Sequence, residues 1–338
     1  MRRLAALVTM AVSLLVPAAA GAHTHLEDLR PEPEAVLPRP PDAVRLTFNQ
    51  PVDVIRAGIR NAAVDVLRRA GGRTLVLRPR LPLPAGRADV RFRVLSKDGH
   101  VLRGRYGFVV KRGAVGSGAL ELSEGGTSTR ATVIHGLHHL LFVLAVGLVV
   151  VGPFVLPAAL PAGALRAICV LGALAALGYA AQLPGGFGDT SAGGGWLLRA
   201  GLWLVAAVAV PRALLAGAAL AGVALSLAIN GHAGSFGGAG SVAVDTVHLL
   251  AAGTWLGGLV ALALARGGAD AVSAYARVAL PAFALLVVSG ALNGVLRVAG
   301  VDALVDTSYG RLVVAKAVIA AALAAIALTV LRRRRVPL

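Results

Sequence analysis

A histidine stands where export would create a new N-terminus. His23 directly follows Ala20-Gly21-Ala22, the small-residue pattern at which a secretory signal is cut. Removal of residues 1–22 would leave His23 with a free α-amine beside its own imidazole. The simpler alternative is a frayed terminus in which this histidine binds nothing.

A second group of ligand-type side chains lies in the segment SKDGH, residues 96–100. Asp-Gly is a hairpin signal, so the segment on its own indicates a turn between two strands. Asp98 and His100 are two apart and so share one side of an extended chain. They could supply an oxygen and a nitrogen beside the amine and ring of His23. Because such a tetragonal set of N and O ligands suits Cu(II), the hypothesis is a Cu(II) site.

The other candidate ligands lie in or beside apolar segments: His135, His138, His139, His232, Asp245 and His248. Spacings of three and four residues place several of them on shared helix faces. Imidazole and carboxylate groups in a membrane are costly unless they are paired or ligate an ion. Singly, each has an ordinary explanation as an interfacial residue, a helix cap or part of a solvated loop. As a group they predict an ion site.

The composition indicates a membrane protein. Of 338 residues, 57% are hydrophobic and 14% are charged, whereas soluble proteins have about 25% charged residues. The net charge of +17 does not indicate nucleic-acid binding, because the basic residues are scattered without interleaved aromatics. Both methionines lie within residues 1–22, so the mature chain has no soft thioether ligand for Cu(I).

We expect a multi-domain chain with a signal peptide at 1–22. Residues 23–112 contain six strand-like runs separated by turn residues, which predicts an all-β Greek-key sandwich or barrel. The Gly/Ser-rich stretch 113–130 is predicted to be a flexible linker. Residues 131–335 are predicted to form a polytopic α-helical membrane domain.

About seven membrane spans are predicted, at 132–152, 163–182, 195–210, 213–230, 243–265, 277–297 and 311–331. With the β domain exported, seven spans put the C-terminal RRRR inside the cell, while the outer loops carry no Lys or Arg. The expected location is the cytoplasmic membrane, with the N-terminal domain in the periplasm or outside the cell. All eight histidines then lie toward the outer side. Asn293 and Lys316 also fall within apolar segments, with no clear role.

The N-terminal part resembles the CopC family of periplasmic copper-binding domains over about residues 23–111. The resemblance rests on HTHLEDLRPEPEAVLPRPPDAVRLTFNQPVD and VRFRVLSKDGHVLRGRYGFVV. It implies that His23, through amine and imidazole, acts with Asp98 and His100 as a histidine brace for Cu(II). His25 becomes an optional further ligand.

The C-terminal part is similar to CopD over about residues 230–335, through VDTVHLLAAGTWLGGLVALALA and TSYGRLVVAK. The stretch IHGLHHLLFVLAVGL is more similar to metal permeases of the HupE/UreJ type. The resemblance implies copper import, homeostasis or resistance without enzymatic activity. The expected partners are the copper ion, the lipid bilayer, external copper donors and an intracellular copper acceptor.

Three alternatives stay open. A copper brace also serves polysaccharide monooxygenases, but those need an exposed aromatic face, and we expect Phe48, Phe92, Tyr106 and Phe108 to point inward. Paired membrane histidines could instead bind haem in a redox protein. The chain could also sequester or sense copper without moving it.

Overall fold

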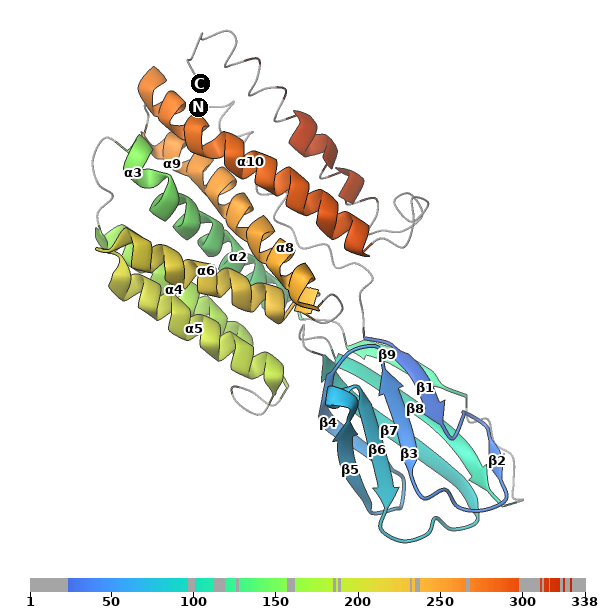
Figure 1. Ribbon diagram of the computed structural model, residues 1–338. Coiled ribbons are helices and arrows are strands. Elements are labelled where there is room, and N and C mark those ends of the chain that lie inside the picture. The colour runs from blue at the N-terminus through green and yellow to red at the C-terminus, as the bar shows by residue number, and fades with distance from the viewer. Residues whose placement is uncertain are drawn as a thin grey trace. The chain divides into compact units, whose positions relative to one another are not determined.

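The computed structural model describes residues 24–96, 101–111, 119–125, 128–156, 162–184, 187, 190–231, 233–234, 238–265 and 268–297, with part of 311–329. The chain divides into a β unit and a helical unit. Each is described by itself (Figure 1).

The β unit is a sandwich of two sheets. Sheet A has the order β1 (Leu26–Arg30), β3 (Val44–Phe48), β6 (Thr74–Pro79) and β5 (Val64–Arg69). Sheet B has the order β2 (Val36–Leu37), β8 (Val101–Val110), β7 (Gly86–Ser96) and β4 (Val52–Ile59), and β9 (Glu121–Gly125) pairs with β8. The predicted all-β N-terminal domain is confirmed, and it is a sandwich.

Strict alternation along the strands builds the sandwich core. In β3, Val44, Leu46 and Phe48 are buried, while the residues between them face outward. The Phe48 and Phe92 rings, one from each sheet, meet edge to face with centroids 5.8 Å apart. Burial raises the pKa of the Tyr106 phenol above its usual value, so the phenol stays neutral. All four aromatic side chains expected to point inward are buried.

Three strands of the β unit lie outside the runs that the sequence predicts as strands. The strands β1 and β2 were not predicted, and β9 lies inside the stretch expected to be a flexible linker. The strand β9 has a polar sequence, ELSEG, without an apolar face. Its pairing with β8 and the 2.5 Å ion pair between Glu121 and Arg105 supply the order that composition does not indicate.

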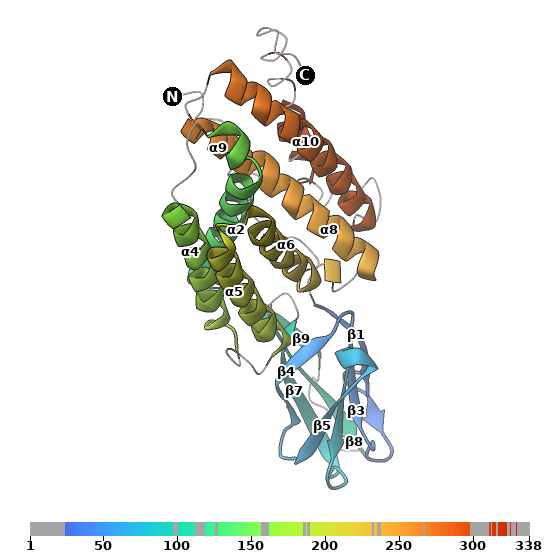
Figure 2. The ribbon, with the colours of Figure 1, turned by 60° about the vertical axis from the view of Figure 1, so that its left-hand side comes forward.

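The helical unit begins with α2 (Thr129–Val150), α3 (Gly152–Val155), α4 (Ala162–Ala180), α5 (Ser191–Ala209) and α6 (Ala213–Ile229). It continues with α8 (Gly238–Ala252), a π-helical turn (Gly253–Gly257), α9 (Gly258–Ala265) and α10 (Ala269–Arg297). The helix α2 is central and contacts α4, α6, α8 and α9 (Figure 2).

Within the described residues, five helices are long and apolar enough to cross a membrane: Thr129–Val150, Ala162–Ala180, Ser191–Ala209, Gly238–Leu264 and Ala269–Gly294. The helix α6 is shorter, and the seventh predicted span, 311–331, is described only in part. The number seven therefore stays a prediction.

Glycines allow the π-helical turn to touch α2 at backbone distance. A Cβ on Gly147 would overlap the backbone of Gly257, and a Cβ on Gly257 would overlap the Val143 carbonyl. Small residues at such crossings are typical of membrane helix packing. The glycines after Trp255 therefore serve close packing.

Gly104 in β8 offers a test of the sandwich core, because a Cβ there would overlap the Phe92 ring. We predict that Gly104→Ala destabilises the β unit by about 1–3 kcal/mol through overpacking. Gly58→Ala, in the same sheet but with open space around it, is the matched control and should be near neutral. Hydrogen exchange of β7 and β8 peptides in the full chain measures the difference. Equal exchange in both variants would contradict the packing described here.

Candidate functional site

Three predicted ligands, His23, Asp98 and His100, lie outside the described residues, as does His232. The residues that flank the first three are described, and they show how the strands bring these parts of the chain together. The contacts of these flanking residues therefore indicate where in the β unit the candidate site lies.

The residue after His23 is anchored inside the sandwich. Thr24 is 4% exposed, and its hydroxyl accepts a hydrogen bond from the side-chain amide of the fully buried Gln50. One residue on, the backbone N–H of His25 donates to Asn49 Oδ1 at 3.0 Å, and Asn49 N–H donates back to the His25 carbonyl at 3.1 Å. These bonds hold the start of the described chain against the segment between β3 and β4.

The same segment is followed by β4, which pairs with the strand that precedes residues 97–100. The strand β4 begins at Val52, which pairs with Ser96, the last residue of β7. Leu95 pairs with Val101, so residues 97–100 join two adjacent antiparallel strands. Thr24 and Ser96 are thus each tied to the start of β4. The fold brings the neighbours of His23 and of Asp98 and His100 to one end of the sandwich.

The helical unit holds a buried group of aromatic rings and histidines around α2. His135, His138 and His139 lie on α2, Tyr179 on α4, and Trp196 and Trp203 on α5. The Trp196 ring lies 5.1 Å from that of His138 and 4.3 Å from that of Tyr179 between centroids. The three histidines are neighbours on α2 within a packed aromatic environment, and their role as ligands stays a prediction.

Hydrogen bonds give the neighbouring histidines different roles. The Trp203 indole N–H donates to His138 Nε2 at 3.0 Å, which occupies the one lone pair of a neutral imidazole. His138 is fully buried, and its Nδ1 finds no partner among the described residues. Metal ligation by His138 would require breaking the bond to Trp203.

In His139 the other ring nitrogen, Nδ1, makes the hydrogen bond. Its Nδ1 lies 2.9 Å from the His135 carbonyl oxygen and must donate the proton, so the lone pair is on Nε2. A histidine whose other nitrogen donates to a backbone carbonyl has the usual arrangement of a metal ligand. The His135 and His139 rings lie 4.5 Å apart between centroids. This pair is the better prepared for ligation.

A buried arginine lies beside this group. Arg199 is 2% exposed, stacks 4.1 Å above Trp196 and donates to the Ser226 carbonyl at 3.1 Å. No carboxylate in the described part of the chain pairs with it. A positive charge here opposes the binding of a second cation nearby. Arg199 lies within an apolar run of the sequence, and that signal could have predicted this buried charge.

Asp245 and His248 lie on α8 and contact a different helix, α10. Asn293 donates to Asp245 Oδ1 at 3.2 Å, and His248 Nδ1 lies 3.0 Å from Ser289 Oγ. Gly290 leaves room for the His248 ring, because a Cβ there would come within 3.2 Å of it. The two polar pairs both link α8 to α10. This gives Asn293 a partner, and Lys316 lies outside the described residues.

Among the residues that the structure describes, no three His, Cys, Asp or Glu side chains gather closely enough to hold a metal ion. The predicted membrane ligands are found as pairs bound to different partners. Tyr179, Trp196, Trp203 and Ser289 were not predicted, because which helices pack together is not visible in sequence spacing.

Comparisons with known protein families match two segments of the chain. Residues 26–111 match the CopC domain, and residues 269–338 match Copper resistance protein D. Copper transport protein CutJ of Bacillus subtilis (strain 168) is 23% identical over an alignment 363 residues long. The alignment covers 90% of this chain and 66% of CutJ. The chain thus spans slightly under two thirds of that relative. Copper resistance protein C of Escherichia coli is 28% identical over 121 residues, 31% of this chain and 95% of that protein.

Two solved structures are similar to the β unit. CopC from Methylosinus trichosporium OB3b is 28% identical and covers 28% of this chain and 100% of its own, with a TM-score of 0.23. PcoC, a methionine-rich copper resistance protein from Escherichia coli, is 29% identical and covers 26% of this chain and 99% of its own, with a TM-score of 0.24.

The bond between Trp203 and His138 predicts a stability effect. His138→Ala leaves the buried indole N–H without an acceptor, so we expect the helical unit to lose about 1–3 kcal/mol. His138→Gln keeps an acceptor near the position of Nε2 and should lose less. Thermal unfolding of the full chain in detergent, followed by tryptophan fluorescence, measures both. If the two variants unfold together at the wild-type temperature, the bond does not contribute to stability.

Proposed function

We propose that this chain, which carries a CopC domain at 26–111 and a CopD domain at 269–338, captures copper outside the cytoplasmic membrane and moves it inward. The observation that carries the proposal is the presence of both copper-family domains in one chain. The similarity to a copper transport protein over 90% of this chain supports it. The copper ion is the cargo, and no enzymatic step is involved.

Capture takes place in the β unit after signal removal. The α-amine and ring of His23, with Asp98 and His100, bind Cu(II) as a brace. The anchoring of Thr24 by Gln50 and the pairing of Val52 with Ser96 support this assignment, because they bring the flanking residues to one end of the sandwich. Amine, imidazole and carboxylate donors match the preference of Cu(II).

Transfer continues through the helical unit. The residues proposed to receive copper are His135, His139, His232, Asp245 and His248. His138 is left out, because its Nε2 lone pair accepts the Trp203 indole N–H. The hydrogen bond from His139 Nδ1 supports His139 as the entry ligand, with His135 beside it. Asp245 and His248 then follow on α8. The β unit lies outside, the C-terminus lies inside, and the partners are external copper donors and an intracellular acceptor.

Variants of the capture site test the first step. We expect His23→Ala and His100→Ala to weaken Cu(II) binding by the full chain by more than about 100-fold, beyond what loss of a supporting residue costs. Gln50→Ala should weaken it about tenfold, because Thr24 loses its anchor. His25→Ala is the matched control and should change little. Competition with a chelator measures each affinity, and undiminished binding in His23→Ala contradicts the brace.

Copper accumulation tests the second step. Cells that produce the wild-type chain should contain more intracellular copper than cells without the gene. His139→Ala should remove that difference, whereas His138→Gln should keep most of it. Elemental analysis of washed cells gives the copper content. Equal copper with and without the gene would mean sequestration or sensing without transport, and a Soret band in the purified chain would indicate a haem protein.

A further inference from the structure

Arginines form a continuous basic face on the outside of sheet B. Arg93 on β7 pairs directly with Arg103 on β8 and with Arg56 on β4. In the next row of the sheet, Arg91 pairs with Arg105. Directly paired residues point to the same side of a sheet. All five guanidinium groups therefore share the outer face of sheet B.

This arrangement is unfavourable within the domain itself, because like charges directly opposite each other in a sheet repel. Glu121 on β9 neutralises Arg105. In the described part of the chain, none of the other four, Arg56, Arg91, Arg93 and Arg103, pairs with a carboxylate. The Nε of Arg93 is also buried without a described partner.

Other arginines of the β unit are matched: Arg30, Arg73 and Arg80 each pair with a carboxylate at about 3 Å. Sheet B differs in placing unmatched arginines directly opposite one another. Negative charge supplied from outside would remove the repulsion.

We propose that the outer face of sheet B, defined by Arg56, Arg91, Arg93 and Arg103, docks on the anionic phospholipid headgroups of the membrane that holds the chain. Guanidinium groups bind phosphate through two parallel hydrogen bonds, and a row of them matches a surface of repeated phosphates. The strand β9 belongs to this sheet, and only residues 126–128 separate it from α2. So short a connection, roughly 10–14 Å when extended, favours lipid over a soluble polyanion. The inference does not depend on copper.

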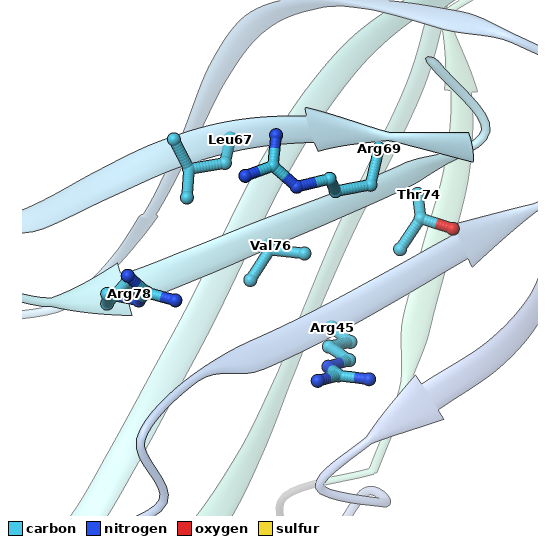
Figure 3. A pocket seen from close by; sticks show the side chains of 6 residues that line it. All are labelled: Arg45, Leu67, Arg69, Thr74, Val76 and Arg78. Atoms are coloured by element: carbon cyan, nitrogen blue, oxygen red, sulfur yellow. The ribbon is translucent and has the colours of Figure 1, made fainter. Parts of the chain in front are cut away.

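The opposite face of the sandwich provides a matched control. Arg45, Arg69 and Arg78 surround a shallow cavity of about 400 Å³ on sheet A, with Leu67 and Val76 as its floor (Figure 3). These arginines are not opposite one another: Arg45 pairs with Val76, Arg69 with Thr74, and Arg78 with Asp65. This face carries three arginines without the like-charge row.

The experiment uses the full chain in lipid nanodiscs, either of phosphatidylcholine alone or with phosphatidylglycerol added. Ser123→Cys lies on β9 opposite Arg103 and reports on the sheet B face. Thr47→Cys reports on sheet A. The native Cys169 is buried. Labelling by a membrane-impermeant maleimide measures the accessibility of each probe.

We expect the anionic lipid to slow labelling of Ser123→Cys by about fivefold or more, because each arginine near an anionic surface favours docking about fivefold. High salt should restore the rate. Neutralising Arg56, Arg93 and Arg103 to Gln should remove the lipid effect, whereas neutralising Arg45, Arg69 and Arg78 to Gln should leave it. The Thr47→Cys rate should not depend on lipid charge.

Several results would overturn the proposal. One is a Ser123→Cys labelling rate that is the same in both lipids. Another is an equal loss of the lipid effect in both triple variants, because that would mean general charge attraction. Protection of Ser123→Cys by soluble polyphosphate in neutral discs, without protection by anionic lipid, would assign the face to a soluble polyanion instead.

Discussion

A single buried hydrogen bond, from the Gln50 amide to the Thr24 hydroxyl, fixes where the chain enters the β unit. Gln50 is fully buried, so its amide would be costly to leave without a partner, and Thr24 supplies the acceptor. Two residues beyond Gln50, β4 begins its pairing with the end of β7. The candidate copper site depends on this constraint, because it brings the residues flanking His23 and those flanking Asp98 and His100 to the same end of the sandwich.

In the helical unit, hydrogen bonding separates side chains that look equivalent in the sequence. His138 and His139 are neighbours on α2, yet one accepts from Trp203 and the other donates to a backbone carbonyl. Both rings carry the lone pair on Nε2, but in His138 that lone pair accepts the indole N–H, whereas in His139 the protonated Nδ1 makes the hydrogen bond. Arg199, stacked on Trp196, adds a buried positive charge beside this group.

Sequence patterns predicted the strands and helices that depend on local alternation of apolar and polar residues or on long apolar runs. The runs at 44–48, 52–59 and 64–69 coincide with β3, β4 and β5, and inward and outward residues alternate most clearly in β3. The strand β9 was missed because its order comes from its neighbour β8, and the helix pairings behind Trp203 and His138, or Asn293 and Asp245, have no signature in spacing. The ligand-type residues were predicted from their chemistry, whereas the bond to Trp203 that distinguishes His138 depends on a tertiary contact.

The central claim is that the α-amine of His23 binds Cu(II), and the nitrogen couplings of the bound ion test it most directly. The processed chain would be produced with histidine that carries heavy nitrogen in the imidazole ring only, loaded with Cu(II), and studied by electron–nuclear double resonance. The account predicts that the couplings of the two ring nitrogens change isotope while one directly bound nitrogen keeps the ordinary isotope, as the amine must. If every directly bound nitrogen changes with the ring label, the amine is not a ligand and the brace is contradicted.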